Sequence, residues 1–405
     1  MRDAKCRFSP LRTAFLAALP ALCALTPEAQ ATTFTVNDST DYPAHVAPNA
    51  ANCAPASATP CKLRDAIAAA TSDENPGDDI VFSLATGSTT IVLSSSLYVF
   101  PNFDTPITID GANAAGGGRV TVNGNHVAPV FSVNRPTDSL LASMTIRNLA
   151  IQNGLNACAS CTTDNGGGIR NYGHLMLDGV TVSGNVAEQF GGGIFNGGAG
   201  TLTVVNSTVS GNSGLRGGGI ANKANLSVIN STISGNSEHG RGALYNNSQG
   251  SAVVTNSTIT GNTSSLDAFT AFYNLGTVTF TNTVIGDACG GLEDASHWTD
   301  GGGNLDGATT CGFSAANSKS NATLNLGPLA DNGGPTQTIM PGAGSDAINF
   351  TVCTNAPFAD QRDYLRPDPA SVGLAAPCDS GAVEAGSVPS DRVFANGFGA
   401  PPIYQ

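Results

Sequence analysis

The chain has 405 residues, and its 30 acidic residues against 17 lysines and arginines give a net charge of −13. Only 12% of the residues are charged and only 6% are aromatic, which excludes a disordered polyelectrolyte and a core built on large aromatic anchors. Nucleic-acid binding needs clustered basic residues, and Lys62, Lys223 and Lys319 are the only lysines after residue 31. We therefore predict no nucleic-acid partner.

Residues 1–31 have the pattern of a signal peptide. Basic residues gather between residues 2 and 12, an apolar run covers Phe15–Leu25, and Ala29–Ala31 is a small-residue cleavage site. The apolar run is too short to span a bilayer, and no later stretch of about 18 apolar residues occurs. We expect an exported protein, extracellular or on the outer cell surface, whose mature chain has no transmembrane segment.

Residues 32–88 are predicted to form an N-terminal cap. Its one helix is expected over Pro60–Ala70, with Thr59 as the N-cap and an apolar face at helical spacing. The acidic run Asp73–Asp79 follows, and carboxylates are ligands that Ca²⁺ prefers. The run lacks the register of an EF-hand loop, so a solvated loop is favoured over a Ca²⁺ site. We predict no metal ion and no other cofactor.

Self-similarity dominates the middle of the chain. Gly-Asn pairs end at Asn185, Asn212, Asn236 and Asn262, at steps of 27, 24 and 26 residues. A Gly-Gly-Gly-Ile motif and a lone asparagine follow these pairs in phase. The lone asparagines are Asn171, Asn196, Asn222, Asn246 and Asn274. Markers that share a period of about 25 residues predict stacked units that contact their neighbours.

Within each unit, apolar residues alternate in short runs rich in β-branched residues, as in Leu226–Val228. We predict about three strands per repeat and an all-β fold, a single right-handed parallel β-helix over residues 89–286. β-Propeller blades need longer repeats, and leucine-rich repeats need a leucine framework. A transmembrane barrel would show aromatic girdles, which the sequence lacks.

A further asparagine recurs at one position of successive repeats. Its copies are Asn206, Asn230, Asn256 and Asn282. Equivalent side chains of stacked coils lie above one another, so a buried amide can bond its copies above and below. We predict that these four asparagines form a structural ladder, while the Gly-Asn pairs supply the positive φ angle of a corner.

The repeat dissolves beyond residue 286. We predict a loop-rich C-terminal cap over residues 287–385 and a flexible tail over residues 386–405. After leader cleavage the cysteines fall as sequence neighbours: Cys53 with Cys61, Cys158 with Cys161, Cys289 with Cys311, and Cys353 with Cys378. An even count in an exported chain predicts disulfides, although the sequence does not choose their pairing. Cys158 and Cys161 have redox-motif spacing, but a loop staple is favoured because no thioredoxin-like pattern surrounds them.

Two segments resemble known families. Cys61–Ile67 resembles the motif of the CSLREA domain of secreted bacterial β-helix proteins, with Lys62 and Asp65 as departures. Residues 303–384 resemble the choice-of-anchor Q domain. That resemblance rests mainly on Leu326–Thr336, Asp360–Arg362, Arg366–Pro367 and Cys378–Glu384. The Gly-Gly-Gly-Ile coils are also similar to the repeats of polymorphic outer-membrane proteins. The resemblances imply an exported, surface-associated β-helix and no catalytic residues.

Charged residues recur between each Gly-Asn corner and the next Gly-rich strand. Counting back from each Gly-rich strand places Glu188, Gly214 and Glu238 at one coil position. The same loops hold Arg216, His239, Arg241 and Asp267. We predict that these residues form a surface ridge of exposed ion pairs, each worth under about 1 kcal/mol, which is a candidate binding surface. Lys223 is expected to be exposed.

A polysaccharide lyase or hydrolase is the alternative to a scaffold, because many parallel β-helices cleave acidic polysaccharides. A lyase needs a carboxylate cluster for Ca²⁺ with a base beside it, whereas the ridge has one acid per coil. Glu188 and Glu238 would lie about 10 Å apart, slightly beyond an inverting pair. We predict no catalytic residues, and a scaffold in adhesion or glycan contact, with glycans or cell-surface components as partners and an oligomeric state left open.

Overall fold

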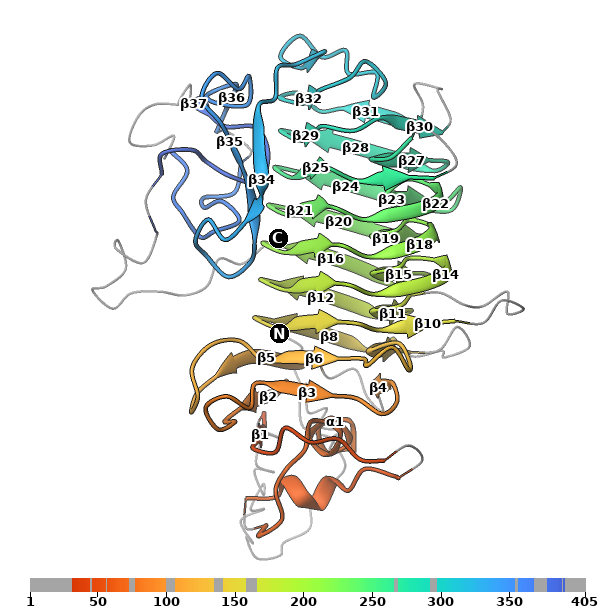
Figure 1. Cartoon of the computed structure of the whole chain (residues 1–405), viewed down its shortest axis with the longest axis vertical. Helices are drawn as coiled ribbons and strands as arrows, with labels where there is room; N and C mark the ends of the chain where they lie inside the picture. Colours follow the sequence, from red (N-terminus) through yellow and green to blue (C-terminus); the bar gives the residue numbers. More distant parts are fainter. Residues whose placement is uncertain are drawn as a thin grey trace, which may run out of the picture.

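The computed structural model is a parallel β-helix with a helical N-terminal cap and a lateral layer on one flank (Figure 1). It describes residues 31–43, 46–55, 57–72, 77–99, 106–134, 141–157, 166–265, 269–291, 297–353, 356–367, 377–387 and 389, without the side chains of Glu238 and His239. Successive coils pair strand on strand in four parallel sheets, here numbered I to IV in the order that one coil visits them.

Sheets I and II form the first two walls of the coil. Sheet I contains β1 (Thr33–Val36), β2 (Asp78–Phe82), β5 (Ile107–Asn113), β8 (Ser143–Arg147), β12 (His174–Asp178), β16 (Thr201–Val205), β20 (Asn225–Ile229), β24 (Ser251–Thr255), β28 (Thr277–Thr281) and β31 (Trp298–Asp300). Sheet II contains β3 (Thr90–Val92), β6 (Thr121–Asn123), β9 (Ala150–Gln152), β13 (Thr181–Ser183), β17 (Thr208–Ser210), β21 (Thr232–Ser234), β25 (Thr258–Thr260), β29 (Val284–Ile285), β32 (Leu305–Asp306) and β33 (Lys319–Ser320).

Sheets III and IV close the coil. Sheet III contains β10 (Leu155–Asn156), β14 (Val186–Phe190), β18 (Ser213–Arg216), β22 (Ser237–Arg241) and β26 (Thr263–Ser264). Sheet IV contains β4 (Leu97–Val99), β7 (Phe131–Val133), β11 (Ile169–Asn171), β15 (Ile194–Asn196), β19 (Ile220–Asn222), β23 (Leu244–Asn246), β27 (Phe272–Asn274) and β30 (Cys289–Gly291). The repeating coils therefore have four strands, not the three expected, because residues 186–190 and their equivalents also pair.

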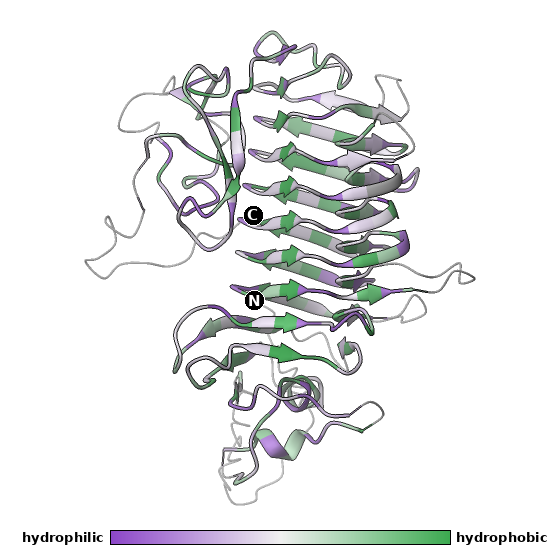
Figure 2. Cartoon of the chain, in the orientation of Figure 1, coloured by the Kyte–Doolittle hydropathy of each residue, from purple (hydrophilic) through white to green (hydrophobic). Residues whose placement is uncertain are grey.

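The core lies inside the coil and follows the alternation that the sequence predicted. In β20 the inward side chains Leu226 and Val228 are buried, and Ile233 and Ile220 from other walls are fully buried beside them. Apolar segments recur at the same place in successive coils (Figure 2). Stacking buries each repeat against the next, because one repeat alone cannot cover its own apolar face.

The stack is longer than the predicted range of residues 89–286. It begins at Thr33, because β1 and β2 already belong to sheet I. It ends at Ser320, because β30 to β33 extend the sheets beyond the last clear repeat. Irregular loop lengths hide these outer coils from a search for a fixed period.

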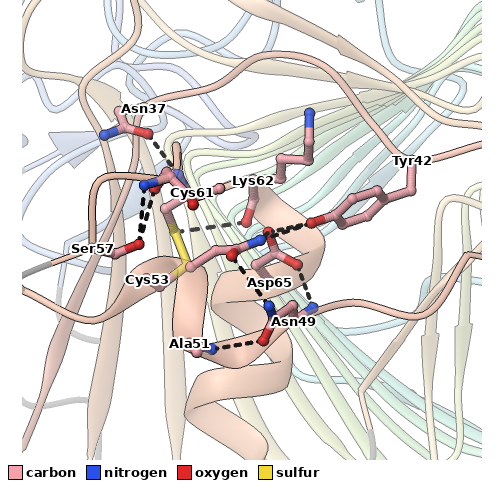
Figure 3. The surroundings of a disulfide bond; sticks show 11 residues. Asn37, Tyr42, Asn49, Ala51, Cys53, Ser57, Cys61, Lys62 and Asp65 are labelled. Carbon is pink, nitrogen blue, oxygen red and sulfur yellow. Dashed lines mark hydrogen bonds between the residues drawn. A yellow bond between two sulfur atoms is a disulfide. The ribbon is translucent and has the colours of Figure 1, made fainter.

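The N-terminal cap contains a 3₁₀ helix (η1, Ala50–Cys53) and α1 (Leu63–Ser72), which starts at Leu63 rather than at the predicted Pro60. Cys61 is held in a loop by its disulfide to Cys53 and by donating its N–H to Asn37 Oδ1 at 2.8 Å (Figure 3). Because Cys61 is held in this loop, the helix begins only at Leu63. The buried Asp65 carboxylate then ties the cap together, accepting hydrogen bonds that include one from Tyr42 Oη at 2.9 Å.

The described cysteines pair as sequence neighbours. Cys53 joins Cys61, Cys289 joins Cys311, and Cys353 joins Cys378. Cys158 and Cys161 lie outside the described residues. No described helix is long and apolar enough to cross a membrane.

Two continuous asparagine ladders run through the stack. The first follows the Gly-Asn corners, where Asn185 Nδ2 donates to Asn212 Oδ1 at 2.9 Å and Asn212 Nδ2 donates to Asn236 Oδ1 at 3.0 Å. Asn262 continues it, and Asp287 ends it by accepting from Asn262 Nδ2 at 3.0 Å. The second joins the lone asparagines by four bonds of 2.8 Å: Asn171, Asn196, Asn222, Asn246 and Asn274.

The predicted ladder of Asn206, Asn230, Asn256 and Asn282 is interrupted. Asn230 Nδ2 reaches Asn206 Oδ1 only at 3.4 Å, and Asn256 Nδ2 is buried with no partner among the described residues. All four residues have a positive φ, between 46° and 51°, and Gly179 takes the same place in an earlier coil. Asparagine and glycine tolerate this left-handed backbone. The main role of these four asparagines is therefore to form a turn, and only some of their side chains bond to each other.

The lateral layer comprises the described part of residues 326–387. It contains the antiparallel pairs β34 (Leu326–Ala330) with β35 (Thr338–Pro341) and β36 (Thr351–Val352) with β37 (Pro377–Cys378). It was predicted as part of an end cap, but it lies along the side of the coils, at the turn between sheets I and II (Figure 1).

Gln361 anchors the lateral layer and is fully buried. Its Nε2 donates to Ser207 O at 3.1 Å and to Thr208 Oγ1 at 2.9 Å, while Thr232 Oγ1 donates to Gln361 Oε1 at 2.6 Å. Thr258 continues the same column and accepts from Ala382 N at 3.0 Å. Outward threonines of successive coils therefore form the docking strip.

Candidate functional site: a cation–aromatic face

The predicted charged ridge does not share one coil position. Ala187, not Glu188, is in register with Gly214, and Gly214 is in register with Glu238. The register shifts between Ala187 and Phe190 and again between Gly214 and Arg216. Counting back by a fixed number therefore misplaces Glu188 by one residue, and its exposed side chain leaves the column that Glu238 belongs to.

The rest of the ridge is described only in part. Arg216 and Arg241 are in register and half-buried. Asp267 lies outside the described residues, as do the side chains of Glu238 and His239. The acidic run is also described in part, and within it Asp78 is buried and accepts a hydrogen bond from Thr32 N at 2.8 Å. Across the described ranges, His, Cys, Asp and Glu side chains form no group of three that could hold a metal ion.

A different cluster occupies this flank, where sheet III turns into sheet IV. We call it the cation–aromatic face and define it as Arg170, Phe190, Phe195, Arg216, Lys223, Arg241, Tyr245 and Tyr273. Sheet IV supplies its outward column, in which Arg170, Phe195, Ala221, Tyr245 and Tyr273 are in register. Sheet III supplies Phe190, which is in register with Arg216 and Arg241.

A glycine triplet joins the two sheets at this flank. Gly191 has a φ of 67°, and a Cβ added to Gly192 would lie 2.2 Å from the backbone oxygen of Ser213. Only glycine fits so close to another backbone. The tight corner brings the end of β14 next to β15, so that the rings of Phe190 and Phe195 lie 6.5 Å apart.

The aromatic rings continue from coil to coil. Phe190 lies 6.0 Å from Tyr245, and Tyr245 stacks on Tyr273 at 6.1 Å. Phe190 and Tyr245 can meet although they are two coils apart, because small Ala221 occupies the column between them. Phe195 and Tyr245 are almost completely buried, whereas Phe190 and Tyr273 are half-buried.

The cations of this face lie over the rings. Lys223 Nζ is 3.9 Å from the centre of the Phe190 ring, the Arg216 guanidinium is 5.3 Å from the same ring, and Arg241 is 4.6 Å from the Tyr273 ring. Such contacts are attractive by about 0.5–2 kcal/mol, and the attraction grows as water is removed. The expectation that Lys223 is exposed is therefore wrong, since its head group is packed on an aromatic ring.

The surroundings of Lys223 disfavour its positive charge. Burial lowers the pKa of its amine, and the nearby positive charge of Arg216 lowers the pKa further. Both causes disfavour the charged form. An anion placed beside Lys223 and Arg216 would reverse the second effect.

The comparisons with known proteins add little to this geometry. No family model matches the chain, and no curated protein matches it. The solved structure of pectate lyase Pel9A is similar over 88% of this chain and 97% of that chain, with 14% identity and a TM-score of 0.42. A likeness of this size supports no statement about activity, so the function is argued from the residues of this chain alone.

The sequence indicated the flank between sheets III and IV as a candidate site, but it did not indicate the cation–aromatic face. Sequence reasoning named Arg216 and Arg241 for their charge and paired them with Glu188 and Glu238. The signal that it passed over was the pair of aromatic residues around the triplet Gly191–Gly193, with Phe190 before it and Phe195 after it. Tyr245 and Tyr273 recur at the position of Phe195 in later coils and extend that signal.

Proposed function

We propose that this chain is an exported, non-catalytic β-helix scaffold that contacts glycans through the cation–aromatic face. Export is supported by the signal-peptide pattern of residues 1–31 and by the three disulfides, since disulfides persist in oxidising compartments. The resemblances at Cys61–Ile67 and residues 303–384 support a location at the cell surface.

The observation that carries the proposal is the repetition of the face along the stack. Rings and cations recur in successive coils, which rise by about 4.8 Å each. A glycan is also a repeating chain, and its sugar rings offer apolar patches between hydroxyl groups. Aromatic side chains with a few polar groups beside them are the usual lining of such binding sites.

A scaffold is favoured over the enzyme alternative because the proposed acid pair loses its geometry. Glu188 lies one residue out of register with the column of Glu238, and it is exposed. The residues on which the choice-of-anchor Q resemblance rests, such as Gln361 and Arg366, hold the lateral layer against the coils.

The test is incubation of the purified mature chain with a panel of neutral and acidic polysaccharides. Retention is measured by affinity electrophoresis, and chain length by size-exclusion chromatography of the polymer. We expect retention by at least one glycan without any shortening of it. A panel in which no glycan retains the folded protein contradicts the proposal, and so does a glycan that is shortened.

A further inference from the structure

We infer that the cation–aromatic face binds an acidic glycan, a linear chain whose carboxylates pair with Arg170, Arg216, Lys223 and Arg241. The inference rests on the proposed function and adds the charge of the ligand to it. The supporting observation is the position of the few positive charges in this acidic chain.

Most described cations are already paired with a carboxylate. Six of them form ion pairs: Lys62, Arg64, Arg147, Lys319, Arg362 and Arg366. The four cations of the cation–aromatic face have no carboxylate within ion-pair distance among the described residues. One other described cation outside these ion pairs, Arg119, donates instead to Gly179 O at 3.4 Å and to Thr181 Oγ1 at 3.1 Å. In a protein with a net charge of −13, four of the five described cations without a carboxylate partner are thus gathered on one flank.

Burial makes this arrangement costly unless a ligand completes it. Arg216, Lys223 and Arg241 are half-buried, and Arg170 is half-buried with its Nε atom lacking a partner in the described part of the chain. Among the described residues, Arg170 donates from Nη2 to Ser132 Oγ at 3.2 Å. Partly desolvated cations gain more from an incoming anion than solvated ones do.

The spacing of the cations favours a polymer over a small anion. Arg216 lies two coils beyond Arg170, and Arg241 lies one coil further. At about 4.8 Å per coil, Arg216 lies about 10 Å and Arg241 about 14 Å from Arg170 along the stack. A single phosphate or carboxylate cannot reach all of them, whereas a chain with a charge on each sugar can.

Phe190 and Tyr273 are the half-buried rings of this face, and they would receive the sugars. Phe190 lies between Arg170 and Arg216 along the stack, and Tyr273 lies one coil beyond Arg241. Phe190 is next to Arg216 and Lys223, and Tyr273 is next to Arg241. A chain running along the stack therefore meets both rings and cations. Three of the four cations are arginines, whose planar guanidinium matches the two oxygens of a carboxylate.

The binding test uses the folded mature chain and matched pairs of polymers at low salt. One pair is a linear polyuronate and the same polymer with its carboxylates esterified. The other pair is dextran sulfate and dextran. We expect the polyuronate to bind at least about tenfold more tightly than its ester and than dextran sulfate, with affinity that falls as salt rises.

Each other outcome overturns the inference in a distinguishable way. Equal binding of the polyuronate and its ester would contradict the claim that the ligand must be acidic, but it would still support glycan contact. Tighter binding of dextran sulfate than of the polyuronate would contradict the claim that the acidic groups of the ligand are carboxylates. Binding of no polymer in either pair or in the wider panel contradicts both the inference and the proposed function.

Variants then locate the site. Arg216→Gln with Arg241→Gln should weaken polyuronate binding about tenfold or more. Lys319→Gln is the control, since Lys319 is a cation paired with Asp346 outside the cation–aromatic face. Lys223→Met is a second test that keeps the stem packed on Phe190 while removing the charge, and it should also weaken binding. Unchanged affinity in the folded Arg216/Arg241 variant or in Lys223→Met places the ligand elsewhere and contradicts the inference.

Discussion

Two flanks of the same solenoid use charge in opposite ways. On the flank between sheets I and II, Arg366 is buried, donates to Glu384 Oε2 at 2.9 Å and contacts Asn230. On the flank between sheets III and IV, Arg216 lies over an aromatic ring and has no carboxylate partner among the described residues. The described lateral layer lies along the first flank, and β14, β18 and β22 of the second flank lie on the other side of the coils (Figure 1).

The comparison teaches which charges hold the fold and which are free to hold a ligand. Arg362 also pairs within the lateral layer, donating to Asp360 Oδ2 at 2.6 Å, and both residues are buried. Buried charges persist only when they are paired and hydrogen-bonded, so these ion pairs belong to the structure of the lateral layer. Arg366 Nε, like Arg170 Nε, is buried without a partner among the described residues. The charged groups of Arg216, Lys223 and Arg241, in contrast, lie over aromatic rings and have no carboxylate partner among the described residues.

The largest effect is expected from breaking the buried pair of the lateral layer. Arg366→Met leaves Glu384 buried beside Asp379 without its cation, which should destabilise the protein by about 3–5 kcal/mol. The measurement is denaturant unfolding. Arg147→Met is the matched control, because its pair with Asp110 is more exposed and should contribute under about 1 kcal/mol. Equal shifts in the two variants would remove the distinction between the flanks.

The next effect concerns the hydrogen-bonded anchor of the lateral layer. Gln361→Leu keeps the side-chain size but leaves the Thr232 hydroxyl without its acceptor, whereas Ser207 O still accepts from Thr232 N at 3.0 Å. We expect a loss of about 1–3 kcal/mol for each buried group left unpaired, seen as a lower thermal midpoint. Asn256→Gly is the contrasting change, because glycine accepts the left-handed turn and Asn256 Nδ2 has no partner to lose within the described residues. A larger loss from Asn256→Gly than from Gln361→Leu contradicts this account of docking.

A pH dependence separates the lateral layer from the exposed surface. Burial, and then the neighbouring Asp379, raise the pKa of Glu384 to about 7. Its folded pKa lies above its unfolded value, so the protonated form is favoured by folding. The stability that this group contributes is therefore present below about pH 4.5 and is lost as pH rises through 7.

Unfolding free energies measured from pH 5 to 8 test this behaviour. The wild type should lose stability over that window from this group, and Glu384→Gln should flatten the slope. Glu188→Gln, at an exposed position, is the control and should keep the wild-type slope. A slope that survives in Glu384→Gln would assign the pH dependence to another group.

The smallest effect is expected at the predicted ridge. Glu188→Gln should change stability by only a few tenths of a kcal/mol, because the side chain is exposed. It should leave glycan retention unchanged or slightly stronger, since one negative charge is removed near the face. Loss of glycan binding in this variant would indicate that the predicted ridge, and not the cation–aromatic face, binds the glycan.

The sequence predicted the parts of the fold that depend on local pattern. Alternating apolar residues and in-phase glycines were enough for a parallel β-helix, and they placed Asn185 and Asn222 in repeating columns. The assignment of the ladder failed at Asn256, because the same residue type serves either as a bonded amide or as a left-handed turn, and only the backbone decides between them.

The site was harder to predict, for two physical reasons. A bulge shifts the register between Ala187 and Phe190, so counting residues cannot align charges across coils. Contacts between a cation and a ring also join residues of different coils, such as Lys223 and Phe190, which no motif contains. Such pairs become visible only when the coils are stacked.

The most direct test of the central claim is one retention measurement on two folded variants. Arg216→Gln with Arg241→Gln and Arg366→Met are each run through a gel containing the polyuronate, at a temperature where circular dichroism shows both to be folded. We predict that the first variant loses retention, whereas the second, although less stable, keeps it. Equal retention of both variants, or loss of retention in Arg366→Met alone, would contradict the division of the cations between fold and ligand.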